Sequence, residues 1–153
     1  KHREEIYATH HNDGNKNIYP CRSIRTSRYK YILNLHPEWA HTTHIDQGGG
    51  SGDGWHYFRE WDQLAKQDAQ MKDNFMRYYN RPREELYDLT SDPDELHNLA
   101  DDVANQTTLV DLRLKLETWR KSQPESDVKV EPRLLSNLKS WQFVLPANVP
   151  NPK

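Results

Sequence analysis

The stretch from Arg83 to Ala100 constrains the fold more than any other part of this chain, because strand, turn and helix patterns follow one another in it with almost no spacer. From Glu84 to Leu89, side chains alternate with the period of two that is typical of a half-buried strand. Tyr87 adds an aromatic residue that favours strands near the centre of this pattern. The sequence therefore predicts a strand here.

A tight turn and a short helix are predicted directly after this strand. Ser91 or Asp92 can cap the helix, and Pro93 fits a first helical turn because no N–H is needed there. The two acidic residues after Pro93 suit the positive end of a helix dipole. We expect this short helix to run through Leu96 and Leu99.

The composition predicts a small core. Only 34% of the 153 residues are hydrophobic, 29% are charged, and the mean hydropathy is −1.11. A chain of this size suits one domain, but so few apolar residues make it only marginally stable alone. We therefore expect it to be part of a longer protein, which the lack of an initiator Met at position 1 also favours.

The charge balance argues against nucleic acid as a partner. A formal charge of −2 gives no general attraction to nucleic acid. Basic residues do mix with tyrosines from Arg22 to Tyr31, but a charged strand surface explains this more simply than nucleic-acid binding.

No apolar run is long enough to span a membrane, and a single cysteine excludes an internal disulfide framework.

The periodicity along the chain predicts an α+β domain: a small antiparallel sheet of about four strands with a C-terminal helix on one face. The predicted strands lie near residues 4–9, 18–26, 29–35 and 84–89, and the helix near 106–121. Helical spacing also covers residues 55–79, where the polar stretch 66–72 favours a break.

Two segments lack any such period. Residues 36–54 include a Gly-rich run and predict a long mobile loop inside the domain. Residues 124–153 contain several prolines and predict an extended tail, anchored near Trp141 and Phe143. The predicted organisation is thus a domain over residues 1–123 followed by this tail.

Three motifs of the Arg83–Ala100 stretch carry a family resemblance. Glu85-Leu-Tyr-Asp-Leu89, then Asp92-Pro-x-Glu95 and Asn98-Leu-Ala100, resemble the signature near the C-terminus of type I sulfatases of the alkaline phosphatase superfamily. The segment from Tyr19 to Ile32 is similar to the strand pair that opens the same C-terminal domain. The pair His10-His11 resembles heparan N-sulfatases (sulfamidases, N-sulfoglucosamine sulfohydrolases) in particular. The match runs from about Glu5 to about Arg120.

This resemblance implies the C-terminal domain of an enzyme that hydrolyses sulfate or sulfamate groups of glycosaminoglycan sugars. Its N-terminal catalytic domain would be this chain's partner and would supply a formylglycine and calcium. No cofactor is expected in the chain itself. The family also implies a periplasmic, extracellular or lysosomal location.

Cys21 is not expected to be the formylglycine precursor. The family makes that group from Cys or Ser in a Cys/Ser-x-Pro-x-Arg context. Cys21 has Arg25 four residues later, but Ser23 stands where the proline is needed. It also lies in a predicted strand, where a half-buried structural cysteine is the simpler interpretation.

The candidate substrate-binding residues are His10, His11, Asp13 and Arg22. We expect the loop from His10 to Asp13 to leave a rigid strand and to face the active site of the catalytic domain. Imidazole groups suit an anionic sugar, and Arg22 could offer two parallel hydrogen bonds to a sulfate or carboxylate. The alternative is that the two histidines are ordinary solvated loop residues.

Two further hypotheses concern metal binding and a different class of function. His36, His41, His44 and Asp46 suggest a metal site, but their spacing in a predicted loop does not define one. The alternative to an enzyme part is a stand-alone, non-catalytic module that binds anionic sugars or docks onto a partner. An upstream Cys/Ser-x-Pro-x-Arg motif in the gene would favour the enzyme.

Overall fold

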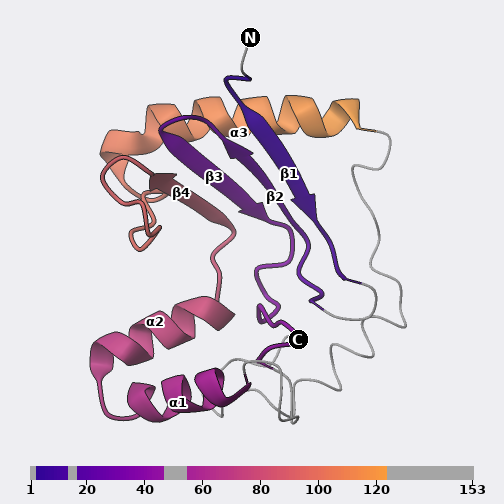
Figure 1. The fold of residues 1–153 in the computed structure, drawn as a ribbon. Coiled ribbons are helices and arrows are strands. Elements are labelled where there is room, and N and C mark those ends of the chain that lie inside the picture. Colours follow the sequence, from indigo (N-terminus) through magenta and orange to yellow (C-terminus); the bar gives the residue numbers. More distant parts are fainter. Residues whose placement is uncertain (1–2, 14–16, 47–54, 124–153) are drawn as a thin grey trace. The chain divides into compact units, whose positions relative to one another are not determined.

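The computed structural model describes residues 3–13, 17–46 and 55–123, drawn in colour in Figure 1. They form two compact units that alternate along the chain. The sheet unit comprises the described residues of Lys1–His10, Pro20–Leu35 and Pro82–Val128, and the helical unit those of His11–Tyr19 and His36–Arg81. Each unit is described separately below.

The sheet unit contains a four-stranded antiparallel sheet in the order β1-β2-β3-β4 (Figure 1). The strands are β1 (Ile6–His10), β2 (Cys21–Arg25), β3 (Tyr29–Asn34) and β4 (Glu84–Asp88). Each strand pairs with the next along the chain, and all four fall within or next to their predicted ranges. The predicted α+β class and four-stranded sheet are confirmed.

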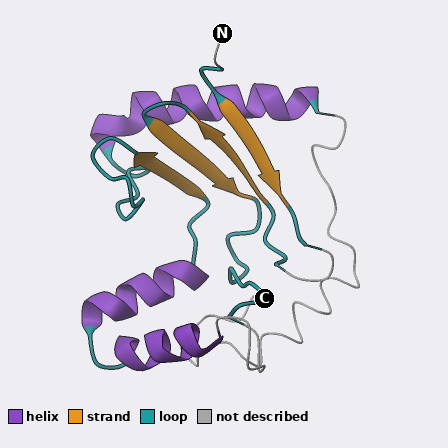
Figure 2. Ribbon diagram, viewed as in Figure 1, coloured by secondary structure: helices purple, strands orange, loops and turns teal. Residues whose placement is uncertain are grey.

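Helix α3 (Gln106–Ser122) lies across one face of this sheet, as Figures 1 and 2 show. Ile24, Tyr31 and Leu86 stand opposite one another in the strand register, so their side chains form an apolar row across that face. The helix packs a stripe of leucines on this row: Leu109, Leu112 and Leu116. Burial of this stripe is what holds the predicted C-terminal helix in place.

Polar contacts fix α3 on the sheet at two places. Arg113 donates two hydrogen bonds, of 2.7 and 2.9 Å, to the carboxylate of Glu84, which also accepts one from the hydroxyl of Tyr31. The guanidinium of Arg113 is the main reason that the pKa of the Glu84 carboxyl is lowered. Lys115 pairs with Glu5 at 2.6 Å, in the segment before β1.

The short helix predicted through Leu96 and Leu99 is not present, and that prediction is wrong. Residues 89–102 form turns and irregular backbone, followed by a short 3-10 helix, η1 (Val103–Asn105). The carboxylate of Asp92 accepts hydrogen bonds from the backbone N–H groups of Leu96 and His97, and Glu95 has a φ of 56°. A left-handed residue at this point interrupts a right-handed helix.

The backbone of this segment follows β4 instead. The side chain of Asn98 accepts a hydrogen bond from the N–H of Leu86 and donates one to the carbonyl of Glu84. The N–H of Leu99 donates to the carbonyl of Leu86, and that of Asp92 to the carbonyl of Asp88. The polar groups on the outer side of β4 are thus satisfied by a loop rather than by another strand.

The helical unit is built around two helices, α1 (Trp55–Ala65) and α2 (Ala69–Tyr79). The break between them falls in the polar stretch predicted to interrupt the helix, and Asp68 caps α2 by accepting a hydrogen bond from the N–H of Met71. Their shared core is aromatic: the rings of Trp61 and Phe75 meet edge to face with centroids 5.2 Å apart.

The remaining predictions about the chain's organisation concern residues that lie partly outside the described ranges. The predicted loop is irregular over residues 36–46, whereas its Gly-rich remainder, 47–54, lies outside the described residues. The predicted tail, 124–153, with its anchor at Trp141 and Phe143, also lies outside them, so the boundary after residue 123 stays a prediction. Among the described helices, none is both long and apolar enough to cross a membrane.

Candidate functional site

Arg22 and His10 meet at the end of β1. His10 is the last residue of β1, and Thr9 stands opposite Arg22 in the register. The guanidinium of Arg22 donates hydrogen bonds to the carbonyl oxygens of His10, at 3.3 Å, and of Cys21, at 2.9 Å. Arg22 therefore fixes the strand end from which the predicted binding loop departs.

The burial of Arg22 follows from strand alternation. Its side chain shares a face with Ile24, on which α3 packs, and it is only 1% exposed. His10 stands opposite Cys21, so its imidazole belongs to the other face of the sheet, where it is exposed. The structure thus brings the Arg22 guanidinium to the His10 backbone but not to the His10 ring. A role for Arg22 in holding a sugar anion stays a prediction.

His11 and Asp13 belong to the helical unit. The carbonyl of His11 accepts a hydrogen bond of 3.0 Å from the N–H of Tyr19, which closes the loop between them. His11 is half-buried and Asp13 is exposed. Asn17 in the same loop accepts a hydrogen bond of 2.7 Å from the N–H of His44. Hydrogen bonds therefore fix this segment at His11, at Asn17 and at Tyr19.

A polar and aromatic cluster in the helical unit was not recognised from the sequence. The ring of His41 lies edge-on to Tyr19 and to Tyr78, with centroids 5.1 and 4.8 Å apart. The hydroxyl groups of Tyr78 and Thr43 are hydrogen-bonded at 3.0 Å. Burial raises the pKa of Tyr78 above its ordinary value, so the hydroxyl keeps its proton well above neutral pH. Nothing local in the sequence indicates this cluster, because its members come from three separate segments.

The four residues considered as metal ligands take up different roles. The ring of His36 stacks on Trp39 at 3.9 Å, and His41 packs between two tyrosines, while His44 contacts Asn17. One oxygen of Asp46 accepts a hydrogen bond from the N–H of Thr43. Across residues 3–13, 17–46 and 55–123, no group of three or more His, Cys, Asp or Glu side chains could hold a metal ion.

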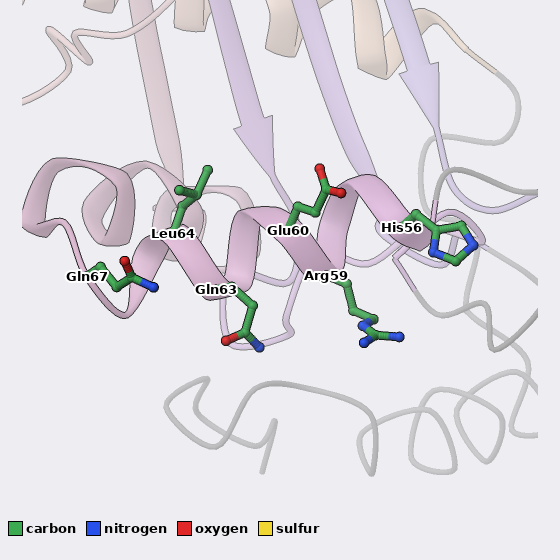
Figure 3. Close-up of a pocket in the computed structure, with 6 residues that line it drawn as sticks. All are labelled: His56, Arg59, Glu60, Gln63, Leu64 and Gln67. Atoms are coloured by element: carbon green, nitrogen blue, oxygen red, sulfur yellow. The ribbon is translucent and has the colours of Figure 1, made fainter.

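A pocket of about 480 Å³ lies along α1, shown in close-up in Figure 3. Its lining residues are His56, Arg59, Glu60, Gln63, Leu64 and Gln67. All come from α1 and the turn that follows it, and in Figure 3 Glu60 points to the opposite side of the helix from Arg59. Side chains that diverge from a single helix do not converge on a ligand, so we assign no site to this pocket.

The comparisons with known proteins point to one class, the sulfatases. Two curated relatives, both ulvan-active sulfatases of Formosa agariphila, match the chain. The first is 34% identical over 106 residues, which are 64% of this chain and 16% of the relative. The second is 33% identical over 115 residues, which are 75% of this chain and 20% of the relative. No protein-family model matches the chain.

The chain is therefore homologous to sulfatases over the shared part, and it spans a fifth or less of the length of these relatives. Two solved structures are also similar: a candidate sulfatase from Bacteroides thetaiotaomicron, at a TM-score of 0.48, and a 2-O GAG sulfatase, at 0.47. Each is 21% identical, and each match covers 88% of this chain and 20% of the other. At these TM-scores the structural likeness adds no argument, so the homology rests on the sequence matches.

Proposed function

We propose that this chain is the C-terminal domain of a larger sulfatase that releases sulfate from an anionic polysaccharide. The observation that carries the proposal is the sequence similarity to two ulvan-active sulfatases, which extends over 64% and 75% of the chain. The position near the C-terminus is supported by the motifs between Glu85 and Ala100.

Within such an enzyme, the chain would complete the fold and form one wall of the substrate pocket. The residues proposed to contact the sugar are His10, His11 and Asp13, with Arg22 holding the strand end before them. An imidazole that carries a proton binds a sulfate or carboxylate with a charge-assisted hydrogen bond. The exposed ring of His10 and the defined backbone of the loop from His11 support this assignment.

The chemical step is assigned to the rest of the enzyme. Calcium needs several oxygen ligands that converge, and the described residues contain no cluster of carboxylates that fits it. Cys21 is half-buried within β2, and its sequence context does not fit a formylglycine precursor. We propose, as the family resemblance implies, that an N-terminal catalytic domain holds both formylglycine and calcium, and we derive no step through either from this chain.

The substrate can be proposed at two levels of detail. The names of the two relatives, both ulvan-active sulfatases, support a sulfated substrate of the ulvan kind. The pair His10-His11, which resembles heparan N-sulfatases, supports the narrower proposal of an N-sulfated glucosamine. The two levels differ in the bond cleaved, an O-sulfate ester or a sulfamate, and can be separated by assay.

The decisive experiment starts from the gene. We expect coding sequence upstream of Lys1 to contain a Cys/Ser-x-Pro-x-Arg motif, and the complete protein to release sulfate from ulvan or heparan oligosaccharides. The 153-residue chain alone should release none. Sulfate release by the isolated chain would contradict the proposal, and a start codon directly before Lys1 would favour a stand-alone binding module instead.

The role of the loop is tested in the complete enzyme with His11→Ala. Loss of one hydrogen bond to a charged group should lower kcat/KM on the preferred oligosaccharide on the order of tenfold. His97→Ala, at an exposed position of the sheet unit, is the control and should leave the kinetics unchanged. Equal kinetics for His11→Ala and the natural enzyme would remove His11 from the site.

A further inference from the structure

A second hollow, of about 390 Å³, lies at the end of the sheet where β1 begins and where a turn joins β2 to β3. It is lined by Arg3, Glu4, Ile6, Arg25, Thr26 and Ser27. All six residues belong to the sheet unit, and they come from two segments that the register brings together. None of them belongs to the candidate site described above.

The strand register sets two of these side chains next to each other. Ile6 and Arg25 are partners in the β1–β2 pairing, so both side chains lie on the face of the sheet opposite α3. Ile6 is 58% exposed, which is unusual for a large aliphatic side chain within a strand. The hollow therefore combines an exposed apolar surface with a guanidinium group.

The turn that forms one wall is rigid. The N–H of Thr26 donates to the carbonyl of Tyr29 at 2.8 Å, and the hydroxyl of Thr26 accepts from the N–H of Tyr29 at 2.9 Å. These bonds fix the backbone on either side of Ser27 and directly after Arg25. A ligand that bound here would have little chain to order, which lowers the entropic cost of binding.

The two arginines of the hollow differ from the neighbouring basic residues in their pairing. Arg28 pairs with Asp88 at 2.8 Å, and Lys30 pairs with Glu95 at 2.6 Å. Arg3 and Arg25, by contrast, make no ion pair or hydrogen bond through their side chains within the described part of the chain. Two guanidinium groups thus line one hollow with their donors available to an external anion.

We propose that this hollow binds one sugar unit of an anionic polysaccharide, through Arg3 and Arg25 on a sulfate or carboxylate group. Glu4 and Ser27 supply an acceptor and a hydroxyl for the sugar hydroxyl groups, and Ile6 packs against the apolar face of the ring. The choice of a polysaccharide rests on the proposed function. The volume of the hollow falls in the range of small-molecule sites, which favours a sugar over the broad surface of a protein partner.

The test is the affinity of the purified 153-residue chain for ulvan oligosaccharides, measured by calorimetry. Loss of two charge-assisted contacts in the double variant R3Q/R25Q should weaken binding by about tenfold or more. The matched control is R83Q/K121Q, which removes the same charge at exposed positions outside the hollow; Arg83 precedes β4 at the opposite end of the sheet. This control should stay within about twofold of the natural chain. Desulfated ulvan separates the anions: retained affinity assigns the carboxylate, and lost affinity the sulfate.

Three results would overturn the inference. Unchanged binding by R3Q/R25Q would show that the hollow is not used, and an equal loss in both double variants would show diffuse charge attraction instead. A loss of association with the catalytic domain, without any loss of sugar affinity, would show a protein contact. Circular dichroism of each variant confirms folding. Sulfate release by the complete enzyme is scored separately, so binding can fail while the proposed function stands, and the reverse.

Discussion

The two units of this protein differ in the contacts that join the chain segments within each of them. In the sheet unit, charged side chains far apart in the sequence pair across the structure, as Glu84 does with Arg113 and Lys115 with Glu5. In the helical unit, the contacts that join separate segments are mainly between rings, as for Trp61 with Phe75 and His41 with Tyr78. Both units bury an apolar core, but the sheet unit adds specific ion pairs between its segments, whereas the helical unit joins its segments mainly by contacts between rings.

The two kinds of contact contribute differently to the alignment of the elements and to the free energy of unfolding. An exposed ion pair contributes only about 0–1 kcal/mol, but its geometry is satisfied by one alignment of helix and sheet. An aromatic pair contributes about 0.5–1.5 kcal/mol beyond its burial and tolerates a range of tilts. We expect substitutions of buried side chains to lower stability in either unit, whereas substitutions of charges should affect mainly the sheet unit.

The largest expected effect is in the helical unit, with Phe75→Ala. Phe75 is 3% exposed, and its removal leaves a cavity in a small core, so the free energy of unfolding should fall by about 4 kcal/mol. Hydrogen exchange checks where this happens: protection should be lost in α1 and α2 while α3 stays protected. Tyr57→Ala, at a residue 66% exposed, is the control. Equal loss of protection in α3 would show that the units unfold together.

The matching change in the sheet unit is Leu116→Ala. Leu116 is 1% exposed beneath α3, and its truncation should lower the free energy of unfolding by about 3 kcal/mol, as measured by urea denaturation. Leu114→Ala on the same helix, at a residue 66% exposed, should change it by less than about 0.5 kcal/mol. Similar losses for the two leucines would contradict the packing described for α3.

The polar pairing is tested with Glu84→Gln. Since Arg113 lowers the pKa of Glu84 in the folded protein, the carboxylate stabilises the fold above its ordinary pKa, and this contribution is lost as the pH falls through the lowered value. The variant should be about 1 kcal/mol less stable at pH 7, after allowance for solvent exposure. The difference should shrink as the pH falls below 4.5.

The control for this pH dependence is Glu117→Gln. Glu117 pairs with Arg120 only three residues away on the same helix and is 43% exposed, so it does not join helix to sheet. Thermal unfolding between pH 3 and pH 7 should give nearly parallel curves for Glu117→Gln and the natural protein. A difference for Glu84→Gln that stayed constant over this range would show that its charge is not involved.

The smallest effect is expected for Tyr78→Phe. This change removes only the hydroxyl that is hydrogen-bonded to Thr43 and keeps the ring between its aromatic neighbours, so the loss should be about 0.5 kcal/mol in the free energy of unfolding. Tyr57→Phe, at an exposed ring, should have no measurable effect. A loss as large as that for Phe75→Ala would place polar contacts, rather than ring packing, at the centre of the helical unit.

Much of the fold could be predicted from the sequence because its elements have clear periods. The strand from Glu84 to Asp88 and helix α3 each show one, and the break before α2 is indicated by the polar residues around Asp68. The short helix through Leu96 could not be excluded in this way. The residues that favour its start, Asp92 and Pro93, favour turns equally well, and the hydrogen bonds of Asn98 and Leu99 with β4 are seen only in the tertiary structure.

The candidate site was less accessible to sequence reasoning. Arg22 lies two residues before Ile24 and so on the same strand face, which is a signal for a buried side chain, but the carbonyl group of His10 that it binds depends on the register between β1 and β2. The hollow near Arg25 has the same origin, because nothing in the sequence places Arg3 and Arg25 together before that register is known. Both features depend on pairing between segments rather than on local pattern.

The loop that follows β4 has a consequence for self-association. An uncovered outermost strand can recruit a strand from another molecule and start an aggregate. Because Asn98 and Leu99 occupy the outward carbonyl groups of Glu84 and Leu86, that side of the sheet offers no template for growth. An alanine in place of Asn98 would leave the N–H of Leu86 and the carbonyl of Glu84 without these partners and would so uncover part of this strand edge.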